Sequence, residues 1–277
     1  MSEYTLYLGD CLEYMRGMGD ESIDLTVTSP PYDNLRAYDG YTFDFEGIAK
    51  QLYRVTKPGG VVTWVVGDAT INGSETGTSF RQALYFMECG FNLHDTMFYH
   101  TDKPPINDNR YHQCIEFMFI LSKGKPKTYN PIMVEVSDNP LSEQRRKYKS
   151  YSGYQRNVDG VFNPKNKVMN NGVKVKSNLW HYRAGFSAND SIASIHPAVF
   201  PEALARDHII SWSNSGDLVF DPMCGSGTTG EMAIQYQRNF IGCDVSEKYI
   251  AIAEKRIKQA QMQMLLPLDI ERSSPMK

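Results

Sequence analysis

The chain has 277 residues, of which 41% are hydrophobic and 12% aromatic, so it can form a buried core and is not globally disordered. No apolar run reaches the roughly 20 residues that span a bilayer, and we expect no secretory signal at the N-terminus. Five scattered cysteines without zinc-ligand spacing favour a reduced, cytoplasmic chain with no metal site.

The net charge of −3 conceals a basic segment, residues 144–183, which holds ten Lys or Arg residues against one acidic residue, Asp159. The rest of the chain is therefore strongly acidic. An acidic body that carries one basic segment predicts a contact with a polyanion that is confined to this region.

Strand and helix patterns alternate along the first part of the chain. In chain order they predict strand 4–8, helix 11–18, strand 23–28, helix 45–56, a turn at 57–60, strand 61–66, helix 78–89, and strands 94–99 and 114–121. This alternation predicts an α/β fold with a mostly parallel sheet and helices on both of its faces.

Regular patterns fade between residues 123 and 189, where Asn, Lys, Tyr, Gly and Pro dominate. They resume with helix 201–213, strand 218–221, helix 228–236, strand 239–243 and helix 247–261. We therefore expect a core made of residues 1–122 and 190–265, an inserted irregular region at 123–189, and a loose tail at 266–277.

A glycine-rich turn joins the strand at 218–221 to the helix at 228–236. It reads Asp-Pro-Met-Cys-Gly-Ser-Gly-Thr-Thr over residues 221–229, and the next strand ends at Asp244. Glycines let a backbone approach a ligand, a helix N-terminus offers N–H groups, and a carboxylate at this place can accept both ribose hydroxyls. A purely structural turn also explains the glycines. Because the sequence lacks Gly-Lys-Ser/Thr, it favours a nucleoside ligand without a phosphate chain.

The sequence Ser-Pro-Pro-Tyr, residues 29–32, follows the strand at 23–28, where ligands bind in open α/β sheets. Its two prolines stiffen the backbone and keep the Pro30 carbonyl out of regular pairing. Ser29 Oγ, this carbonyl and the Tyr32 ring suit a planar ligand that carries an NH₂ group. A stiff surface turn with a core tyrosine is the alternative interpretation.

Taken together, the two motifs resemble those of the DNA amino-methyltransferases that use S-adenosylmethionine. Ser-Pro-Pro-Tyr resembles the catalytic corner of that family, and residues 221–229 resemble its cofactor turn, with Met223 in place of a phenylalanine. The corner precedes the turn and the basic segment lies between them, an order that resembles the beta group of the family. Residues 196–204 resemble the segment on the methionine side of the cofactor, with Phe200 where a lysine is common.

The resemblance implies a Rossmann-like class I methyltransferase fold with a permuted motif order. It implies a catalytic corner made of Ser29, Pro30, Pro31 and Tyr32. It also implies that S-adenosylmethionine is bound by Asp10, His196, Pro197, Phe200, Asp221, Pro222, Cys224, Gly225, Ser226, Gly227, Thr228 and Asp244.

The partner that the resemblance implies is double-stranded DNA, from which the target base is flipped out. We expect the basic segment, in which aromatic residues such as Trp180 and Tyr182 alternate with the charges, to recognise the target. The expected DNA-binding residues are Arg36, Arg145, Arg146, Lys147, Lys149, Arg156, Lys165, Lys167, Lys174, Lys176 and Arg183. A solvated basic loop is the plain alternative.

Several alternatives stay open at this point. The target amine belongs to adenine (N6) or cytosine (N4), and Ser29 favours cytosine because adenine enzymes of the family more often carry Asp there. The same chemistry on RNA or on a protein amide, or a non-catalytic DNA-binding module, are the other candidates. The sequence also leaves open a homodimer and a cognate restriction nuclease. It disfavours carbon-5 methylation, which needs a Pro-Cys nucleophile.

Overall fold

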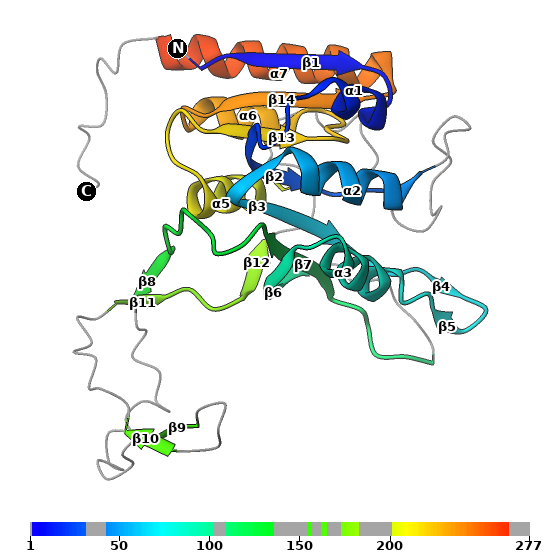
Figure 1. Cartoon of the computed structure of the whole chain (residues 1–277), viewed down its shortest axis with the longest axis vertical. Helices are drawn as coiled ribbons and strands as arrows, with labels where there is room; N and C mark the ends of the chain where they lie inside the picture. The colour runs from blue at the N-terminus through cyan, green and yellow to red at the C-terminus, as the bar shows by residue number, and fades with distance from the viewer. Residues whose placement is uncertain are drawn as a thin grey trace, which may run out of the picture. The chain divides into compact units, whose positions relative to one another are not determined.

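An eight-stranded sheet organises the larger part of the chain in the computed structural model (Figure 1). The structure describes residues 2–31, 43–101, 109–135, 154–156, 162–164, 173–182 and 201–265, with backbone alone for 154–156 and 162–164. In spatial order the sheet contains β1 (Tyr4–Leu8), β14 (Asn239–Asp244), β13 (Leu218–Asp221), β2 (Ile23–Thr28), β3 (Thr56–Val66), β7 (Ile115–Ser122), β6 (Asn92–Thr101) and β12 (Leu179–Tyr182).

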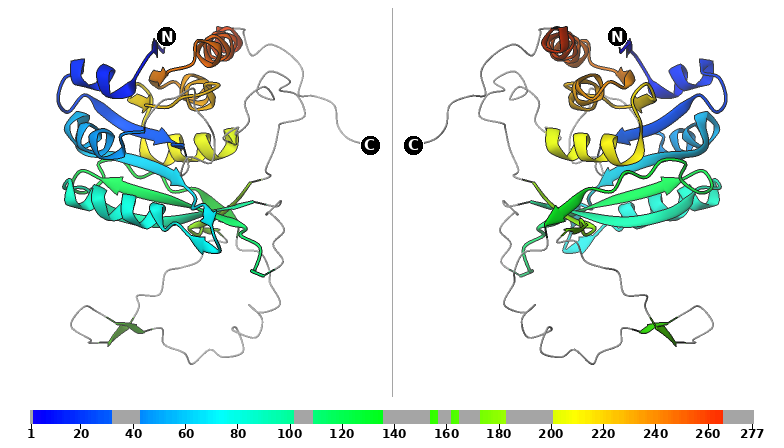
Figure 2. Two further views of the ribbon diagram at one scale, coloured as in Figure 1. Left: turned by 90° about the vertical axis from the view of Figure 1, so that its right-hand side faces the viewer. Right: turned by 90° about the vertical axis from the view of Figure 1, so that its left-hand side faces the viewer.

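The sheet is mostly parallel, because only β7 runs antiparallel to its neighbours β3 and β6. One face is covered by α1 (Cys11–Gly17), α2 (Phe45–Val55) and α3 (Thr78–Glu88), and the other by α5 (Glu202–Trp212), α6 (Thr228–Gln235) and α7 (Glu247–Leu265), as Figure 2 shows. The predicted α/β architecture with helices on both faces is thus confirmed.

The helices follow from their sequences. Asp10 caps α1, since its Oδ1 accepts the amides of Leu12 and Glu13 at 2.6 and 3.2 Å. In α2 the residues Ile48, Ala49, Leu52 and Val55 form one buried stripe with helical spacing. This stripe packs against β3, where Trp64 is fully buried and meets Phe86 of α3 edge to face.

Three local predictions differ from the structure. Residues 57–60, expected as a turn, belong to β3, where the pairing with β2 jumps from Ile23↔Thr56 to Leu25↔Val61. The ladder absorbs these residues as a bulge, and Gly59 at φ +80° permits the bend. The region expected to be irregular contains β12, which joins the main sheet beside β6. The last helix, α7, continues to Leu265, beyond its expected end at residue 261.

The chain divides into two compact units, one of residues 131–177 and one of the remaining residues. The smaller unit contains two strand pairs, β8 (Met133–Glu135) with β11 (Val173–Val175), and β9 (Tyr154–Arg156) with β10 (Phe162–Pro164). In the larger unit, β4 (Thr70–Ile71) and β5 (Ser74–Glu75) form a hairpin between β3 and α3. Among the described residues, no helix is long and apolar enough to cross a membrane.

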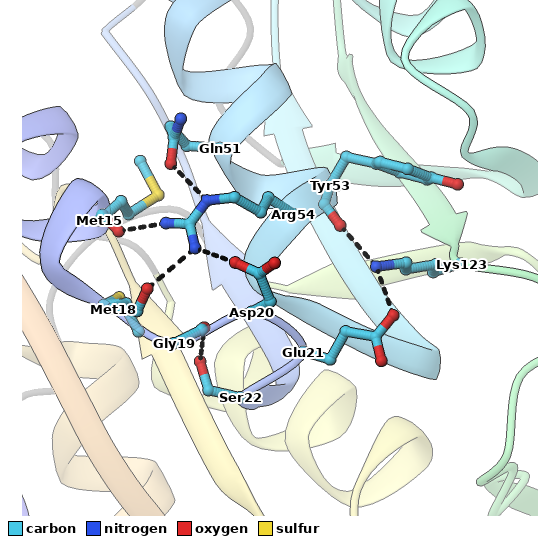
Figure 3. Close-up of polar contacts among 10 residues, drawn as sticks. All are labelled: Met15, Met18, Gly19, Asp20, Glu21, Ser22, Gln51, Tyr53, Arg54 and Lys123. Atoms are coloured by element: carbon cyan, nitrogen blue, oxygen red, sulfur yellow. Dashed lines mark hydrogen bonds and ion pairs between the residues drawn. The ribbon is translucent and has the colours of Figure 1, made fainter.

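A polar cluster closes the amino-terminal edge of the sheet between α1 and α2 (Figure 3). Arg54, near the end of α2, donates to the carbonyls of Met15 and Met18 at the end of α1 and pairs with Asp20. Lys123 donates to the Tyr53 carbonyl at 3.0 Å and pairs with Glu21 at 3.2 Å. These cations donate to carbonyls at the ends of both helices, where the Met15 carbonyl also accepts the amide of Met18 at 3.0 Å.

We expect the substitution Arg54→Met to lower the free energy of unfolding by about 1–2 kcal/mol, because it removes the hydrogen bonds from the guanidinium to the carbonyls of Met15 and Met18. The control is Lys50→Met, since Lys50 is exposed, pairs with Glu46 at 3.9 Å and lies 5.8 Å from the centroid of the Tyr85 ring, so its effect should stay within about 0.5 kcal/mol. Urea unfolding measures both variants, and equal effects would contradict this role for Arg54.

Candidate active site

Four adjacent parallel strands bring the motifs to one edge of the sheet. β1, β14, β13 and β2 lie side by side, and their carboxyl ends lead to Asp10, Asp244, Asp221 and Ser29, respectively. The register confirms this alignment, since Leu8 pairs with Asp244 and Asp221 pairs with Gly242. From β13 the chain continues to its neighbour β14 on one side, whereas from β2 it continues to its neighbour β3 on the other side. The boundary between β13 and β2 is therefore a topological switch point, where open α/β sheets bind ligands.

The Ser-Pro-Pro corner is joined directly to the glycine-rich turn. Thr28, the last residue of β2, is 1% exposed and donates its hydroxyl to Asp221 Oδ1 at 2.7 Å. The amide of Met223 donates to the same oxygen at 3.1 Å. A second link runs from Thr229 Oγ1 to the carbonyl of Val27 at 3.4 Å. These buried bonds hold together two segments that lie far apart in the sequence.

The corner itself begins one residue after Thr28. Ser29 and Pro31 are half-buried and Pro30 is buried. The corner is therefore built from the end of a core strand. Tyr32 and Arg36 lie outside the described residues.

The turn is shaped by two glycines and one carboxylate. Gly225 and Gly227 have φ values of +49° and +81°, a region that suits glycine, and α6 begins directly after them at Thr228. Asp244 Oδ2 accepts the amide of Gly225 at 2.9 Å, while its Oδ1 accepts the amide of Ser246 at 2.8 Å. The turn and the end of β14 are thus one unit.

Two carboxylates lie at this edge of the sheet, the buried Asp221 and the half-buried Asp244. Burial raises the pKa of Asp221 to about 6, although the hydroxyls of Thr28 and Thr229 oppose the shift, and desolvation also raises the pKa of Asp244. Within the described part of the chain, neither carboxylate has an ion-pair partner. A positively charged ligand would stabilise the ionised form of both groups, and Asp244 keeps lone pairs for hydroxyl donors. The residues present therefore fit a nucleoside with a sulfonium group.

Asp10 lies beside Asp244, because the amide of Gly9 donates to the Asp244 carbonyl at 2.9 Å. Both helix-capping bonds of Asp10 are accepted by Oδ1. The structure thus brings together Asp10, Asp244 and the turn. His196, Pro197 and Phe200, which the sequence also assigned to the cofactor, lie outside the described residues.

The cysteines near this edge do not suit nucleophilic catalysis. Burial raises the pKa of the Cys11 thiol to about 12, and burial also raises the pKa of Cys224 well above its ordinary value. A protonated thiol is a poor nucleophile at neutral pH. These two thiols therefore do not support a covalent intermediate.

The basic segment is described only in part. Lys174 is exposed and Lys176 half-buried, and both stand in β11 or next to it. Trp180 is buried against His208 and Tyr182 donates to Asp207 at 2.6 Å, so these two aromatic residues serve the core instead of facing DNA. The side chains of Arg145, Arg146, Lys147, Lys149, Arg156, Lys165, Lys167 and Arg183 lie outside the described residues. Among the residues described, no group of His, Cys, Asp or Glu could hold a metal ion.

Sequence reasoning missed two residues that organise this edge. Thr28 links the corner to Asp221, but a threonine at the end of a strand belongs to no sequence motif that would predict this contact. Arg256 of α7 donates to the turn at Ser226 and Thr228. A signal for Arg256 was present, since it stands in the buried stripe of Ala253, Ile257 and Ala260.

Comparisons with known proteins agree with this geometry. Residues 23–255 match a family described as DNA methylase, specific for N6 and N4. The orphan methyltransferase M.BamHII of Bacillus amyloliquefaciens is 53% identical over 250 residues, which cover 87% of this chain and 91% of that protein.

Two solved structures share the fold. The cytosine-N4-specific PvuII DNA methyltransferase aligns with a TM-score of 0.69 at 20% identity, over 96% of this chain and 93% of that one. A putative DNA modification methylase of Thermus thermophilus, TTHA0409, complexed with S-adenosyl-L-methionine, aligns with a TM-score of 0.60 at 23% identity, over 94% of this chain and 96% of that one.

Proposed function

Since this chain belongs to the DNA methylase family of N6 and N4 amino-methyltransferases, we propose that Ser29 and Pro30 bind the N4 amine of a flipped cytosine for methylation. Membership makes the chain an S-adenosylmethionine-dependent DNA methyltransferase. The base and the roles of individual residues are the new part of the proposal. Ser29 supports cytosine, because adenine enzymes of the family more often carry Asp there.

The chemistry follows from the amine. An exocyclic amine is a poor nucleophile because its lone pair is delocalised into the ring. Ser29 Oγ and the Pro30 carbonyl accept its two N–H groups, which favours tetrahedral geometry at nitrogen and localises the lone pair. Positioning and electrostatics then carry most of the acceleration. The bound S-adenosylmethionine supplies an electrophilic methyl group on its sulfonium sulfur.

The observation that carries this assignment is the bond between Thr28 and Asp221. It fixes the residue that precedes Ser29 against the residue that opens the cofactor turn. The chain therefore holds the site of the amine and the site of the methyl donor in a constant relation, as a direct transfer requires.

The cofactor roles that we propose carry the motif positions of the family onto this sheet edge. Asp244 accepts the ribose hydroxyls, Asp10 faces the adenine, and residues Asp221, Pro222 and Cys224–Thr228 line the nucleoside and methionine parts. His196, Pro197 and Phe200 complete the methionine side. The two carboxylates, which have no ion-pair partner among the described residues, support this assignment, because the sulfonium cation of the ligand would stabilise their ionised forms.

Flipping the base out of the duplex costs a few kcal/mol, which contacts with DNA must offset. We assign stacking on the base to Tyr32 and contact near it to Arg36. The basic residues between Arg145 and Arg183 bind phosphates and recognise the target, with Lys174 and Lys176 as the described members. Residues 123–189 form the target-recognition region, and the enzyme acts on DNA in the cytoplasm as an orphan methyltransferase or beside a restriction nuclease.

Methyl transfer from labelled S-adenosylmethionine to duplex DNA, with structured RNA as the comparison, tests the substrate. We expect label in DNA and none in RNA. Sequencing of DNA modified by the expressed enzyme then identifies the base, and we expect cytosine within one short motif. Modification of adenine instead would overturn the assignment of the base and leave the DNA substrate intact.

We expect the substitution Asp244→Asn to raise KM for S-adenosylmethionine about 10-fold, since the amide NH₂ cannot accept a bond that the carboxylate accepts now. The matched control is Asp217→Asn, at the opposite edge of the sheet, where Asp217 accepts the amide of Asn214 at 2.7 Å. Steady-state kinetics measure both variants. An unchanged KM in Asp244→Asn would contradict the proposal that Asp244 accepts the ribose hydroxyls.

A further inference from the structure

A single buried arginine joins the cofactor turn to three helices. Arg256 of α7 is 3% exposed, and its Nη1 donates to the Ser226 carbonyl at 3.0 Å and to Thr228 Oγ1 at 2.9 Å. Its Nη2 pairs with Glu202 at 3.0 Å and with Glu231 at 2.7 Å. The guanidinium therefore touches the turn, the first residue of α5 and the first turn of α6.

The two terminal nitrogens of the guanidinium, Nη1 and Nη2, have different kinds of partner. The carboxylates of Glu202 and Glu231 hold Nη2 and balance the buried charge. Nη1 is thereby directed at the turn, where it bonds both backbone and side-chain oxygens. A planar fork with several donors can do this, whereas a lysine offers one compact ammonium group and cannot reach both sets of acceptors.

α7 meets the turn at a second point on the same helix face. A Cβ at Gly227 would lie 2.6 Å from the Cβ of Ala253, so α7 packs directly against the glycine that precedes α6. Ala253 and Arg256 are three residues apart and therefore neighbours on the helix surface. Packing at Gly227 and hydrogen bonds at Ser226 and Thr228 together define the shape of the turn.

We propose that Arg256 is a positioning residue for the cofactor: it holds residues 226–228 in the conformation that binds S-adenosylmethionine and makes no contact with the cofactor itself. The same guanidinium anchors the start of α5, which begins within the segment 196–204 assigned to the methionine side. This inference rests on the proposed placement of the cofactor at the turn.

The test compares Arg256→Lys with Arg238→Lys in the full chain. Arg238 is also buried, and it donates to the carbonyls of Ser213 and Tyr236 at the other edge of the sheet. Calorimetry measures Kd for S-adenosylmethionine, a gel shift measures DNA affinity, and thermal unfolding is recorded with and without cofactor. We expect Arg256→Lys to weaken cofactor binding about 10-fold and to reduce the rise in Tm that cofactor produces, with DNA affinity within about 2-fold.

Arg238→Lys should keep the wild-type Kd for the cofactor even where its Tm without ligand is lower. A wild-type Kd in Arg256→Lys, or an equal weakening in both variants, would overturn the proposal in favour of a general effect on stability. If Arg256→Lys does not fold, Glu202→Gln replaces it. That variant keeps an oxygen acceptor and loses the charge that orients the guanidinium, so we expect about 3-fold weaker binding, and an unchanged Kd overturns the role.

Asp244→Asn separates this proposal from the one on which it rests. If the wild type binds the cofactor but Asp244→Asn binds it equally well, the cofactor does not lie at the turn and the proposed function fails in that respect. If Asp244→Asn weakens binding while Arg256→Lys and Glu202→Gln do not, only the positioning role of Arg256 fails.

Discussion

Replacing Ser29 by alanine is expected to lower kcat by about 100- to 1000-fold and to leave KM for S-adenosylmethionine within about 2-fold. The substitution removes one of two oxygens that accept the amine protons, an interaction that strengthens as the nitrogen becomes tetrahedral. Its loss therefore appears in the transition state more than in ground-state binding. Single-turnover methylation of a duplex at saturating cofactor measures the effect directly.

The matched control for this prediction lies at the other end of the same strand. Ser22 precedes β2 at the opposite edge, where its hydroxyl donates to the Gly19 carbonyl at 2.8 Å, and Ser22→Ala should keep the full rate. Ser29→Asp places an oxygen acceptor at the same position and should recover part of the activity. Full activity in Ser29→Ala, or none in Ser29→Asp together with normal folding, contradicts the role of an acceptor at this position.

The second large effect concerns pH and Asp221. Its pKa in the folded protein is about 6, above the ordinary value of 3.8, so the folded state retains this proton over a pH range in which the unfolded chain has lost it. The free energy of unfolding therefore decreases through this group as the pH rises from about 4 through 6, and its ionisation destabilises the folded protein above that range. Between pH 4 and pH 8 the loss is on the order of 2 kcal/mol.

Asp221→Asn removes this titration and preserves the geometry, because Thr28 and Met223 both donate to the same oxygen, Oδ1. Without cofactor, we expect the variant to gain stability relative to the wild type as the pH rises from 4 to 8, by on the order of 2 kcal/mol. Urea unfolding of both proteins at several pH values measures the difference, with Asp217→Asn as the control. A constant difference between Asp221→Asn and the wild type would contradict the raised pKa.

Much of the fold could be predicted because its elements carry local signals. The strand at 23–28 alternates apolar and polar residues and is followed by Ser-Pro-Pro, and the strand at 218–221 is apolar up to Asp221. The helix α2 has a clear buried stripe with Asp44 as its cap. Residues 57–60 were mistaken for a turn because Pro-Gly-Gly is a turn signal. In the structure, Gly59 and Gly60 exchange backbone bonds with Lys123 and Lys127, which no local pattern reveals.

β12 was missed for a related reason. It is a short strand in a segment rich in Lys and Asn, and only its long-range pairing with β6 defines it. Trp180 then becomes a core residue, although its basic neighbours suggested contact with DNA.

The candidate site likewise contains some residues that local motifs predicted and others that they did not. Ser29, the glycine-rich turn and Asp244 follow from motifs whose spacing and flanking strands place them at one sheet edge. Thr28 and Arg256 could not be assigned, since each acts through contacts with residues distant in the sequence. Such contacts exist only once the sheet has formed and the helices have packed on it.

The position of the transferred methyl group tests the central claim most directly. DNA methylated by the wild type with isotopically labelled S-adenosylmethionine is digested to nucleosides, and mass spectrometry locates the label. If two oxygens at the corner activate an exocyclic amine, the label lies on an exocyclic nitrogen, which we expect to be N4 of cytosine, and its incorporation slows about 100- to 1000-fold in Ser29→Ala. A label on carbon 5 of the ring would contradict this chemistry, because that product requires a covalent nucleophile.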